Sequence, residues 1–252
     1  MSSARDIDDY QRAYAASDFE PTQALMRKRM LLELLARWKP RRLLEVGCGS
    51  DPLFAHYRDF DRFCVVEPGA GFAQQATATA AGDARVRVVQ AFMEDAAGVL
   101  AAENFDCILL SGLLHEVPDC QPLLAAVASL CGPDTRVHVN VPNAQSLHRL
   151  LALEMGLITE LHELSANQRN LQQPRTFDLD ILGELCRRCG FDVQESGSYF
   201  VKPFTHRQMA QLQGIGLLDE RMLSGLYGLE RHVPGLGSEI FVNLRRTAAG
   251  SA

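Results

Sequence analysis

The stretch LLEVGCGSDP, residues 43–52, places an apolar run, a glutamate and two glycines within ten residues. The part up to Val46 has the pattern of a short buried strand. Gly47 and Gly49 follow where that strand ends, and glycines at such a point let a loop backbone approach a nucleotide-containing ligand. A dinucleotide-binding loop would have a third glycine where this chain has Pro52. The glycines alone therefore leave open whether the ligand carries a pyrophosphate.

The charged residues around the glycines favour a ligand without a pyrophosphate. Pro52 suits the first turn of a helix, which Ser50 or Asp51 is expected to cap. The Asp51 carboxylate would repel a pyrophosphate, but it can accept a hydrogen bond from an ammonium group. Glu45 lies within the apolar strand pattern, where a carboxylate is costly to bury unless it has a partner. These charges favour S-adenosylmethionine, which has a cationic amino-acid end, over NAD.

A further carboxylate follows the next strand pattern, RFCVVEP, at residues 62–68. Glu67 comes 20 residues after Gly47, which is the spacing at which a strand-end carboxylate reaches a ribose diol. Both S-adenosylmethionine and NAD contain such a ribose. Glu67 therefore supports a nucleoside-containing ligand without choosing between the two.

Composition and charge limit the partners. The chain has 252 residues, 47% of them hydrophobic and 22% charged, enough for a sizeable core. A net charge of -6 argues against nucleic acid as a partner. Because there is no secretory signal pattern and no apolar run long enough for a membrane span, we expect a cytoplasmic protein without membrane contact. The seven cysteines are scattered, and the pair Cys186 and Cys189 lacks a second pair, so no metal site is expected.

Short apolar runs alternate with amphipathic segments along the chain. Strands are expected at 43–46, 62–68, 86–92, 105–111, 135–142, 191–200 and 238–246. The clearest helical patterns are at 22–38, 70–81, 120–132 and 179–191. This alternation is typical of an α/β fold in which helices cover both faces of a mainly parallel sheet.

The expected organisation is an N-terminal helical cap over residues 1–40 and one sheet domain over 41–252. Two mostly helical insertions interrupt the sheet domain, at about 144–174 and 202–236, and both exceed the usual strand-to-helix loop of about 2–6 residues. Long excursions from the carboxyl edge of a parallel sheet tend to form lids and substrate walls. We expect the insertions to form a lid, and they also offer surfaces for a homodimer.

Five segments, in their order and spacing, resemble the motifs of class I S-adenosylmethionine-dependent methyltransferases. They are LLEVGCGSDP, VVEPGAGF, VRVVQAFMEDA, FDCILLSGLLHEVPD and HVNVPNAQSL. The resemblance, to the small-molecule branch of these enzymes, implies a Rossmann-like, doubly wound seven-stranded sheet whose last strand, at 238–246, is antiparallel.

The resemblance also implies which residues hold S-adenosylmethionine. Glu45 would help to hold the methionine end, either through its ammonium group or through the loop. Gly47 and Gly49 would let the loop backbone approach the cofactor, and Glu67 would take the ribose hydroxyls. The other expected contacts are Cys48, Pro68, Phe92, Met93, Ser111 and Gly112.

This sequence departs from the family pattern at two cofactor positions. Asp51 stands where the first motif often has a third glycine, and Phe92 stands where many members have an aspartate that binds the adenine amino group. Adenine would then rest on Phe92 or Met93 and contact backbone N–H groups, with Glu94 as a polar partner.

The catalytic candidates follow the fourth strand pattern. Ser111 and Gly112 would line the passage beside the methyl group, and His115 and Glu116 are expected to start a short helix. Several relatives have the order Glu-His at this place, whereas this chain has His-Glu. A metal-binding role of the pair in those relatives is therefore not assigned to His115 and Glu116. A hydroxyl acceptor needs a base, and neutral histidine suits that task near pH 7. His115 is the first candidate. His148 and His206 in the two insertions are its rivals, whereas His138 lies inside a strand pattern and is expected to be a core residue.

The expected activity is methyl transfer to a hydroxyl, or less favourably an amine, of a small biosynthetic metabolite such as a sugar, a nucleotide sugar or a phenol. Aromatic residues near the N-terminus, Tyr10, Tyr14 and Phe19, are candidates for closing over the cofactor. Polar groups for a hydroxylated or anionic acceptor are Tyr199, Lys202 and His206. Two alternatives remain: an NAD-dependent oxidoreductase on a similar sheet, and a non-catalytic methyltransferase-like binding protein.

Overall fold

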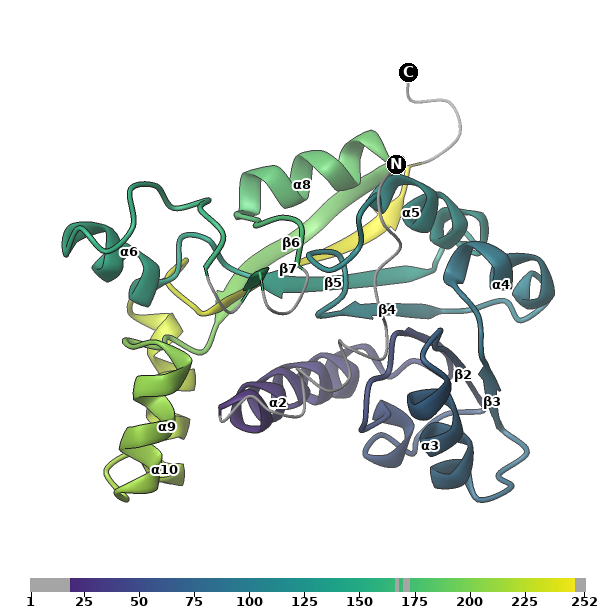
Figure 1. The fold of residues 1–252 in the computed structure, drawn as a ribbon. Coiled ribbons are helices and arrows are strands. Elements are labelled where there is room, and N and C mark those ends of the chain that lie inside the picture. The colour runs from purple at the N-terminus through teal and green to yellow at the C-terminus, as the bar shows by residue number, and fades with distance from the viewer. Residues whose placement is uncertain (1–18, 166–167, 170–172, 248–252) are drawn as a thin grey trace.

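The computed structural model describes residues 19–165, 168–169 and 173–247. Its centre is a seven-stranded sheet in the order β3-β2-β1-β4-β5-β7-β6 (Figure 1). The strands are β1 Arg42–Val46, β2 Arg62–Val66, β3 Val86–Val89, β4 Cys107–Ser111, β5 Arg136–Pro142, β6 Phe191–Tyr199 and β7 Glu239–Arg246. Only β7 is antiparallel to its neighbours, β5 and β6, among the pairs described. The predicted α/β fold with an antiparallel last strand is confirmed.

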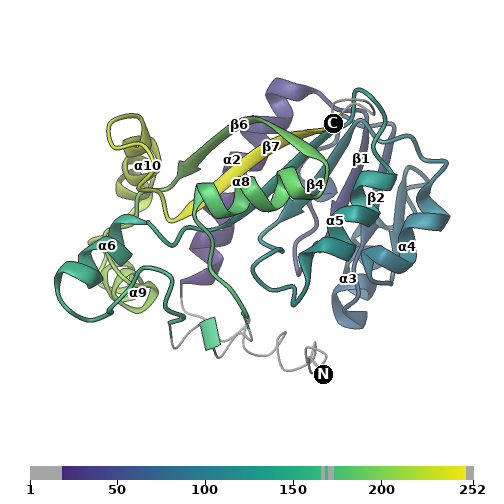
Figure 2. The same ribbon diagram turned by 90° about the horizontal axis from the view of Figure 1, so that it is seen from above.

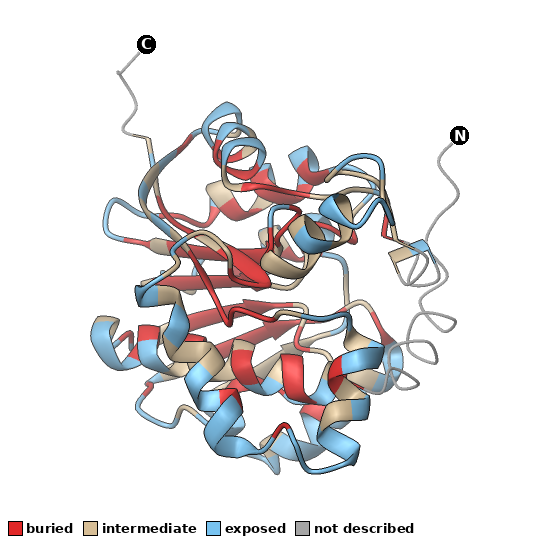
Figure 3. Ribbon diagram, turned by 90° about the vertical axis from the view of Figure 1, so that its left-hand side faces the viewer, coloured by how far each residue is buried: buried red, intermediate tan, exposed pale blue. Residues whose placement is uncertain are grey.

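The inner strands β1, β2, β4 and β5 are buried on both faces because helices cover both faces of the sheet there. In β1, Leu44 and Val46 face one core, while Leu43 faces the other, as the two-residue period of a strand requires. The first core lies under α4 Met93–Leu100, α5 Cys120–Ser129 and α8 Leu179–Arg188. The second lies under α2 Glu20–Trp38, α3 Ala70–Ala80, α9 His206–Gly214 and α10 Glu220–Gly228. Figure 3 shows this as buried strands between helices whose outer faces are exposed.

The helices predicted at 22–38, 70–81, 120–132 and 179–191 all form, with ends shifted by no more than three residues. In the described part of the insertions the helices are α6 Leu147–Glu154, α9 and α10, followed by the short 3-10 helix η2 Leu229–Arg231. These elements gather at one end of the sheet in Figures 1 and 2. Among the described residues, no helix has the length and apolarity needed to cross a bilayer.

The first motif differs from its prediction after the glycines. Only a short 3-10 helix, η1 Leu53–Ala55, follows the loop, and neither Ser50 nor Asp51 caps it. The Leu53 N–H donates instead to a Glu45 carboxylate oxygen at 3.0 Å. The carboxylate of Asp51 is bound by Lys28 and by His56, which draws it away from the start of η1.

The segment that carries His115 and Glu116 is a turn over residues 114–116 rather than the predicted short helix. The Glu116 N–H donates to the Leu113 carbonyl at 2.9 Å. Pro118 prevents the turn from extending, because the residue before a proline is disfavoured in the helical region. The next helix, α5, then begins at its own cap, Asp119.

Candidate active site

A cavity of about 1120 Å³ opens at the edge where the parallel strands end. The loops after β1, β2, β4 and β5 line it, together with Glu239, the first residue of the antiparallel β7. Helix α2 supplies one wall, and residues of α6 and α9 supply another. The catalytic and cofactor-binding candidates of the sequence analysis all line this cavity, namely Glu45, Gly47, Cys48, Gly49, Glu67, Pro68, Phe92, Met93, Ser111, Gly112, His115, His148 and His206.

The glycine loop has left-handed backbone at two points, with φ of +76° at Gly47 and +57° at Gly49. Side chains other than glycine rarely adopt this conformation. A Cβ added to Gly49 would meet nothing within 4 Å, so the space beside it is open to the cavity. The Cys48 thiol between them is buried, and burial raises its pKa, so the thiol stays neutral.

Glu67 holds this loop in place. One of its carboxylate oxygens accepts the N–H groups of Cys48 at 3.0 Å and Gly49 at 3.3 Å, and the other accepts that of Gly69 at 2.9 Å. Burial raises the pKa of Glu67, and these N–H donors counteract the increase. An ionised carboxylate has about four acceptor sites, so Glu67 has capacity left for a ligand hydroxyl.

Glu45 acts on the other end of the loop. It is buried at the end of β1, and its bond to the Leu53 N–H fixes the chain that returns from the loop. Burial, with a smaller contribution from the nearby Glu67 carboxylate, raises its pKa to about 8, although the hydrogen bond from the Leu53 N–H opposes this. The structure therefore places Glu45 where it shapes the loop.

Glu45→Gln is expected to change how stability depends on pH. A carboxyl whose pKa rises from 4.5 to about 8 on folding stabilises the protein below pH 4.5, and the contribution is lost as the pH rises through 8. Between pH 4.5 and 8, the free energy of unfolding of the wild type should therefore fall by up to about 1.4 kcal/mol per pH unit relative to that of Glu45→Gln. Urea unfolding of both proteins at pH 5.5, 6.5 and 7.5 measures this, and parallel profiles would contradict it.

The candidate adenine contacts lie where α4 begins. Phe92 precedes the helix and is 55% exposed, whereas Met93 is buried behind it. The Phe92 side chain does not cap the first N–H groups of α4, and Glu94 lies in its exposed first turn. A flat apolar surface, helix-end N–H donors and one carboxylate therefore meet at this part of the cavity wall.

Gly112, at the end of β4, lies against a residue that the sequence analysis missed. Its φ is +64°, and a Cβ added there would lie 3.4 Å from the Arg27 guanidinium carbon of α2. The Gly112 N–H donates to the Asn140 carbonyl at 2.9 Å. A Cβ at position 112 would touch the Arg27 guanidinium, and the positive φ would strain any residue other than glycine there.

Arg27 belongs to a buried polar network around Glu239. Its Nε donates to both Glu239 oxygens, at 3.1 and 3.0 Å, and its guanidinium also binds Glu20 at 3.4 Å. Gln23 donates to Glu239 at 2.9 Å. Burial alone would raise the pKa of Glu239, but Arg27 and these hydrogen bonds hold it at about 2. Glu239 directly precedes the apolar run of β7, and a carboxylate at that position was a signal that could have revealed it.

Tyr199 belongs to this network and not to the cavity surface. The expectation that it presents its hydroxyl to an acceptor is wrong, because the residue is buried and its hydroxyl donates to Glu239. Asn140 donates to the same carboxylate at 3.0 Å. β7 pairs with both β5 and β6 here, which brings these side chains together.

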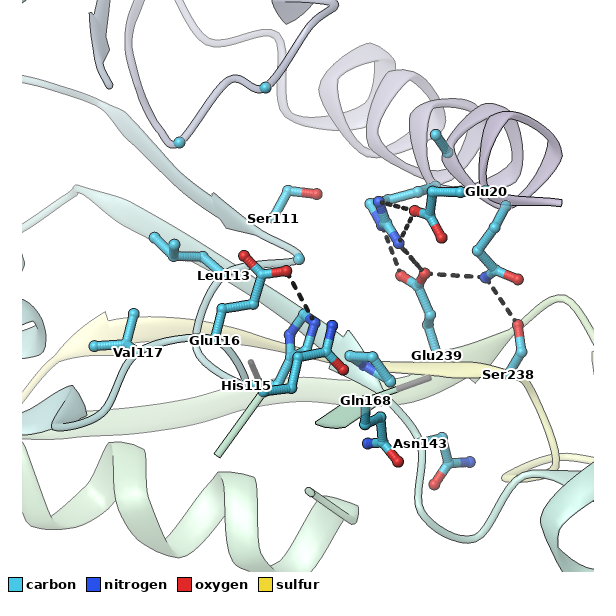
Figure 4. Close-up of a pocket in the computed structure, with 18 of the residues that line it drawn as sticks. Glu20, Ser111, Leu113, His115, Glu116, Val117, Asn143, Gln168, Ser238 and Glu239 are labelled. Carbon is cyan, nitrogen blue, oxygen red and sulfur yellow. Dashed lines mark hydrogen bonds and ion pairs between the residues drawn. The ribbon is translucent and has the colours of Figure 1, made fainter. Parts of the chain in front are cut away.

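The three candidate bases differ in their surroundings. His115 is buried, and its Nε2 lies 3.6 Å from a carboxylate oxygen of Glu116, as Figure 4 shows. His148 Nδ1 lies 3.0 Å from the Ser146 hydroxyl, and burial lowers its pKa well below 6.5. Burial lowers the pKa of His206 to about 3. His138 is fully buried as expected, with Nδ1 at 2.7 Å from the Asn243 side-chain oxygen.

The N-terminal aromatic candidates are only partly within the structure. Tyr10 and Tyr14 lie outside the described residues. Phe19 is buried and lines the cavity, with its ring centroid 6.4 Å from that of Phe200 and 5.6 Å from that of His206. The start of α2 is thereby joined to the second insertion.

The fold and the site together define a class of protein. The strand order with an antiparallel β7, the left-handed glycine loop and the carboxylate after β2 are those of a Rossmann-like class I methyltransferase. A family model described as a methyltransferase domain matches residues 19–196. The chain belongs to that methyltransferase family and is an S-adenosylmethionine-dependent enzyme. This assignment replaces the two alternatives, an NAD-dependent oxidoreductase and a non-catalytic binding protein.

Several solved structures resemble the whole chain at low identity. A methyltransferase from Thermotoga maritima, described as a possible histamine N-methyltransferase, is 17% identical with a TM-score of 0.60, over 96% of both chains. The 1,6-didemethyltoxoflavin-N1-methyltransferase of Burkholderia thailandensis, with bound S-adenosylhomocysteine, is 17% identical with a TM-score of 0.57, over 98% of this chain and 92% of that one. StiE O-MT is 11% identical with a TM-score of 0.52, over 92% of this chain and 76% of that one. No curated protein matches the sequence.

The cavity suits S-adenosylmethionine in two respects. The Ser111 hydroxyl is buried and has no hydrogen-bond partner among the described residues. The space beside Gly49 is open, and the loop around it is already held by Glu67. The methyl donor supplies a methyl group on a sulfonium sulfur, and the protein has to place an acceptor in line with it.

Proposed function

We propose that this methyltransferase acts on a hydroxyl oxygen of a small biosynthetic metabolite. The observation that carries this proposal is the buried His115–Glu116 pair at the cavity wall, one turn beyond the end of β4. An amine acceptor presents its own lone pair once deprotonated, whereas a hydroxyl has to lose a proton during transfer. A histidine beside a carboxylate is suited to take that proton near pH 7.

The cofactor in this proposal binds along the carboxyl edge of the sheet. Gly47 and Gly49 admit its methionine part, Glu67 accepts its ribose hydroxyls, and the adenine rests on Phe92. Three observations support this placement: the loop's positive φ values, the acceptor capacity of the Glu67 carboxylate and the exposed ring of Phe92.

His115 takes the acceptor proton at a ring nitrogen, and Glu116 stabilises the resulting imidazolium. Their separation of 3.6 Å in a buried setting supports the pairing, because ionic attraction is stronger away from bulk water. In Figure 4, Ser111, His115 and Glu116 lie on one side of the space and Glu20 and Glu239 on the other. The acceptor occupies this space, and the two insertions with α2 keep water from it.

The proposal is tested by calorimetry followed by a methyl-transfer screen. S-Adenosylhomocysteine should bind and NAD should not, and a panel of hydroxylated metabolites with matched amines should yield O-methyl products. Methylation of amines alone would refute the oxygen acceptor while leaving the cofactor assignment intact. Failure to bind S-adenosylhomocysteine would refute the cofactor site itself.

His115→Ala is expected to lower kcat by about 100-fold on the acceptor found in the screen, since general bases contribute about that much. The Kd for S-adenosylhomocysteine should stay within about threefold of wild type, because the proposed role concerns the acceptor only. His232→Ala, at an exposed histidine that does not line the cavity, provides the matched control. Unchanged turnover in His115→Ala would remove the residue from the mechanism.

A further inference from the structure

Lys202, just beyond β6, is a buried cation that faces the cavity. The residue is only 2% exposed and lines the cavity wall. Within the described part of the chain, its Nζ forms no hydrogen bond or ion pair, and the centroid of the Phe19 ring lies 5.9 Å from it. A buried ammonium group is costly without a counter-ion. Its position therefore calls for an anion from outside the protein.

The neighbouring side chains make this wall more positive. Arg149 of α6 donates to the backbone carbonyls of Leu161 and Glu163, at 2.6 to 3.1 Å, and forms no carboxylate ion pair among the described residues. Arg207, on the first turn of α9, lies at the exposed rim of the cavity. The buried Nδ1 of His206 has no hydrogen-bond partner within the described ranges. Cationic side chains of α6, α9 and the end of β6 thus line the same cavity, and His206, which burial keeps neutral, adds a ring nitrogen.

The carboxylates nearest to Lys202 are already engaged elsewhere. Glu20 and Glu239 are the acidic groups that act on it, and Arg27 binds both of them. The remaining charged or titratable groups that face it are His148 and His206. Burial is the dominant influence and lowers the pKa of Lys202 to about 7, which the two carboxylates only partly counteract.

We propose that the methyl acceptor carries an anionic group, a carboxylate or a phosphate, which binds against Lys202 with His206 beside it. This inference rests on the proposed function and names the substrate class of the same site. The anion supplies the missing counter-charge, while the hydroxyl to be methylated reaches toward His115 across the cavity. Acceptor binding is tightest where Lys202 is protonated, so with a carboxylate the affinity falls as the pH rises above about 7.

The chain has only three lysines, Lys28, Lys39 and Lys202, so carbon-13 NMR of lysine-labelled protein can follow each one. The protein is saturated with S-adenosylhomocysteine and titrated with acetate or inorganic phosphate up to about 0.1 M, enough for a millimolar site. The Lys202 signal, assigned from its loss in Lys202→Gln, should titrate at a higher pH with the anion present. Lys39 is exposed and should not respond. An unchanged Lys202 titration with both anions would overturn the proposal.

Matched acceptors distinguish the source of the anion. The pairs are 4-hydroxybenzoate with 4-hydroxybenzamide, and glucose 6-phosphate with glucose. The anionic member should have a kcat/KM about 30-fold higher or more, as expected for a buried charge pair. Lys202→Gln and Lys202→Met should abolish the preference, whereas Lys39→Gln should keep it. A preference for the neutral members, or weaker S-adenosylhomocysteine binding in Lys202→Gln, would refute the role of Lys202 in binding the acceptor's anion. Failure of the wild type to bind S-adenosylhomocysteine would instead refute the proposed function.

Discussion

Glu239→Ala is expected to lower the free energy of unfolding by about 3–5 kcal/mol, the usual cost of removing one partner of a buried ion pair. The carboxylate is buried and accepts hydrogen bonds from four side chains. Its loss leaves the donors of Arg27, Asn140 and Tyr199 without their shared acceptor. Desolvated donors without an acceptor add to the cost.

Chemical denaturation at pH 7 measures this effect. Asp59→Ala is the matched control, because Asp59 pairs with Arg41 where both side chains are about half exposed or more, and such surface pairs contribute about 0–1 kcal/mol. Equal stability losses in the two variants would contradict the importance of the network. Since the pKa of Glu239 lies near 2 and its unfolded value is 4.5, its contribution should hold above pH 4.5 and disappear as the pH falls through 2.

Glu67→Ala is expected to weaken S-adenosylhomocysteine binding by about 100-fold, as the loss of charge-assisted hydrogen bonds predicts. Two effects combine here. The ribose loses its proposed acceptor, and the N–H groups of Cys48, Gly49 and Gly69 lose the carboxylate that holds the loop. Both effects act on the cofactor and neither acts on the acceptor.

Calorimetry of S-adenosylhomocysteine binding checks this prediction. Glu67→Gln retains one carbonyl acceptor, so its affinity for S-adenosylhomocysteine should be intermediate, about tenfold weaker than that of the wild type. Asp95→Ala alters an exposed carboxylate on α4 outside the cavity and should bind as wild type does. A Kd for Glu67→Ala close to that of wild type would show that the ribose and the loop are held by other groups.

The sheet and much of the site could be predicted because their signals are local. The period of apolar residues marks each strand, and the strand ends carry Gly47, Glu67 and Ser111 to one edge. The turn at His115 was missed, although Pro118 three residues later is a local signal against a helix. Local patterns therefore located the cavity and the residues along its strand edge.

The Arg27–Glu239 contact could not be predicted in this way. The two residues are 212 positions apart, and no periodicity relates a helix near the start of the chain to a strand near its end. The sequence shows only a carboxylate at the start of an apolar run, and such a carboxylate needs a partner if it is buried. Which partner it has depends on how the sheet brings α2 and β7 together.

The position of β7 also has a consequence for biosynthesis of the protein. β7 follows β6 in the sequence, yet it lies between β5 and β6 in the sheet, and its first residue Glu239 lines the cavity with Ser238 just before it. While the ribosome is still making residues 200–238, β6 lacks its only sheet neighbour among the described strands. The nascent chain therefore cannot complete its binding site until β7 has been made, and a chain that terminates before residue 239 lacks the carboxylate that Arg27 of α2 binds.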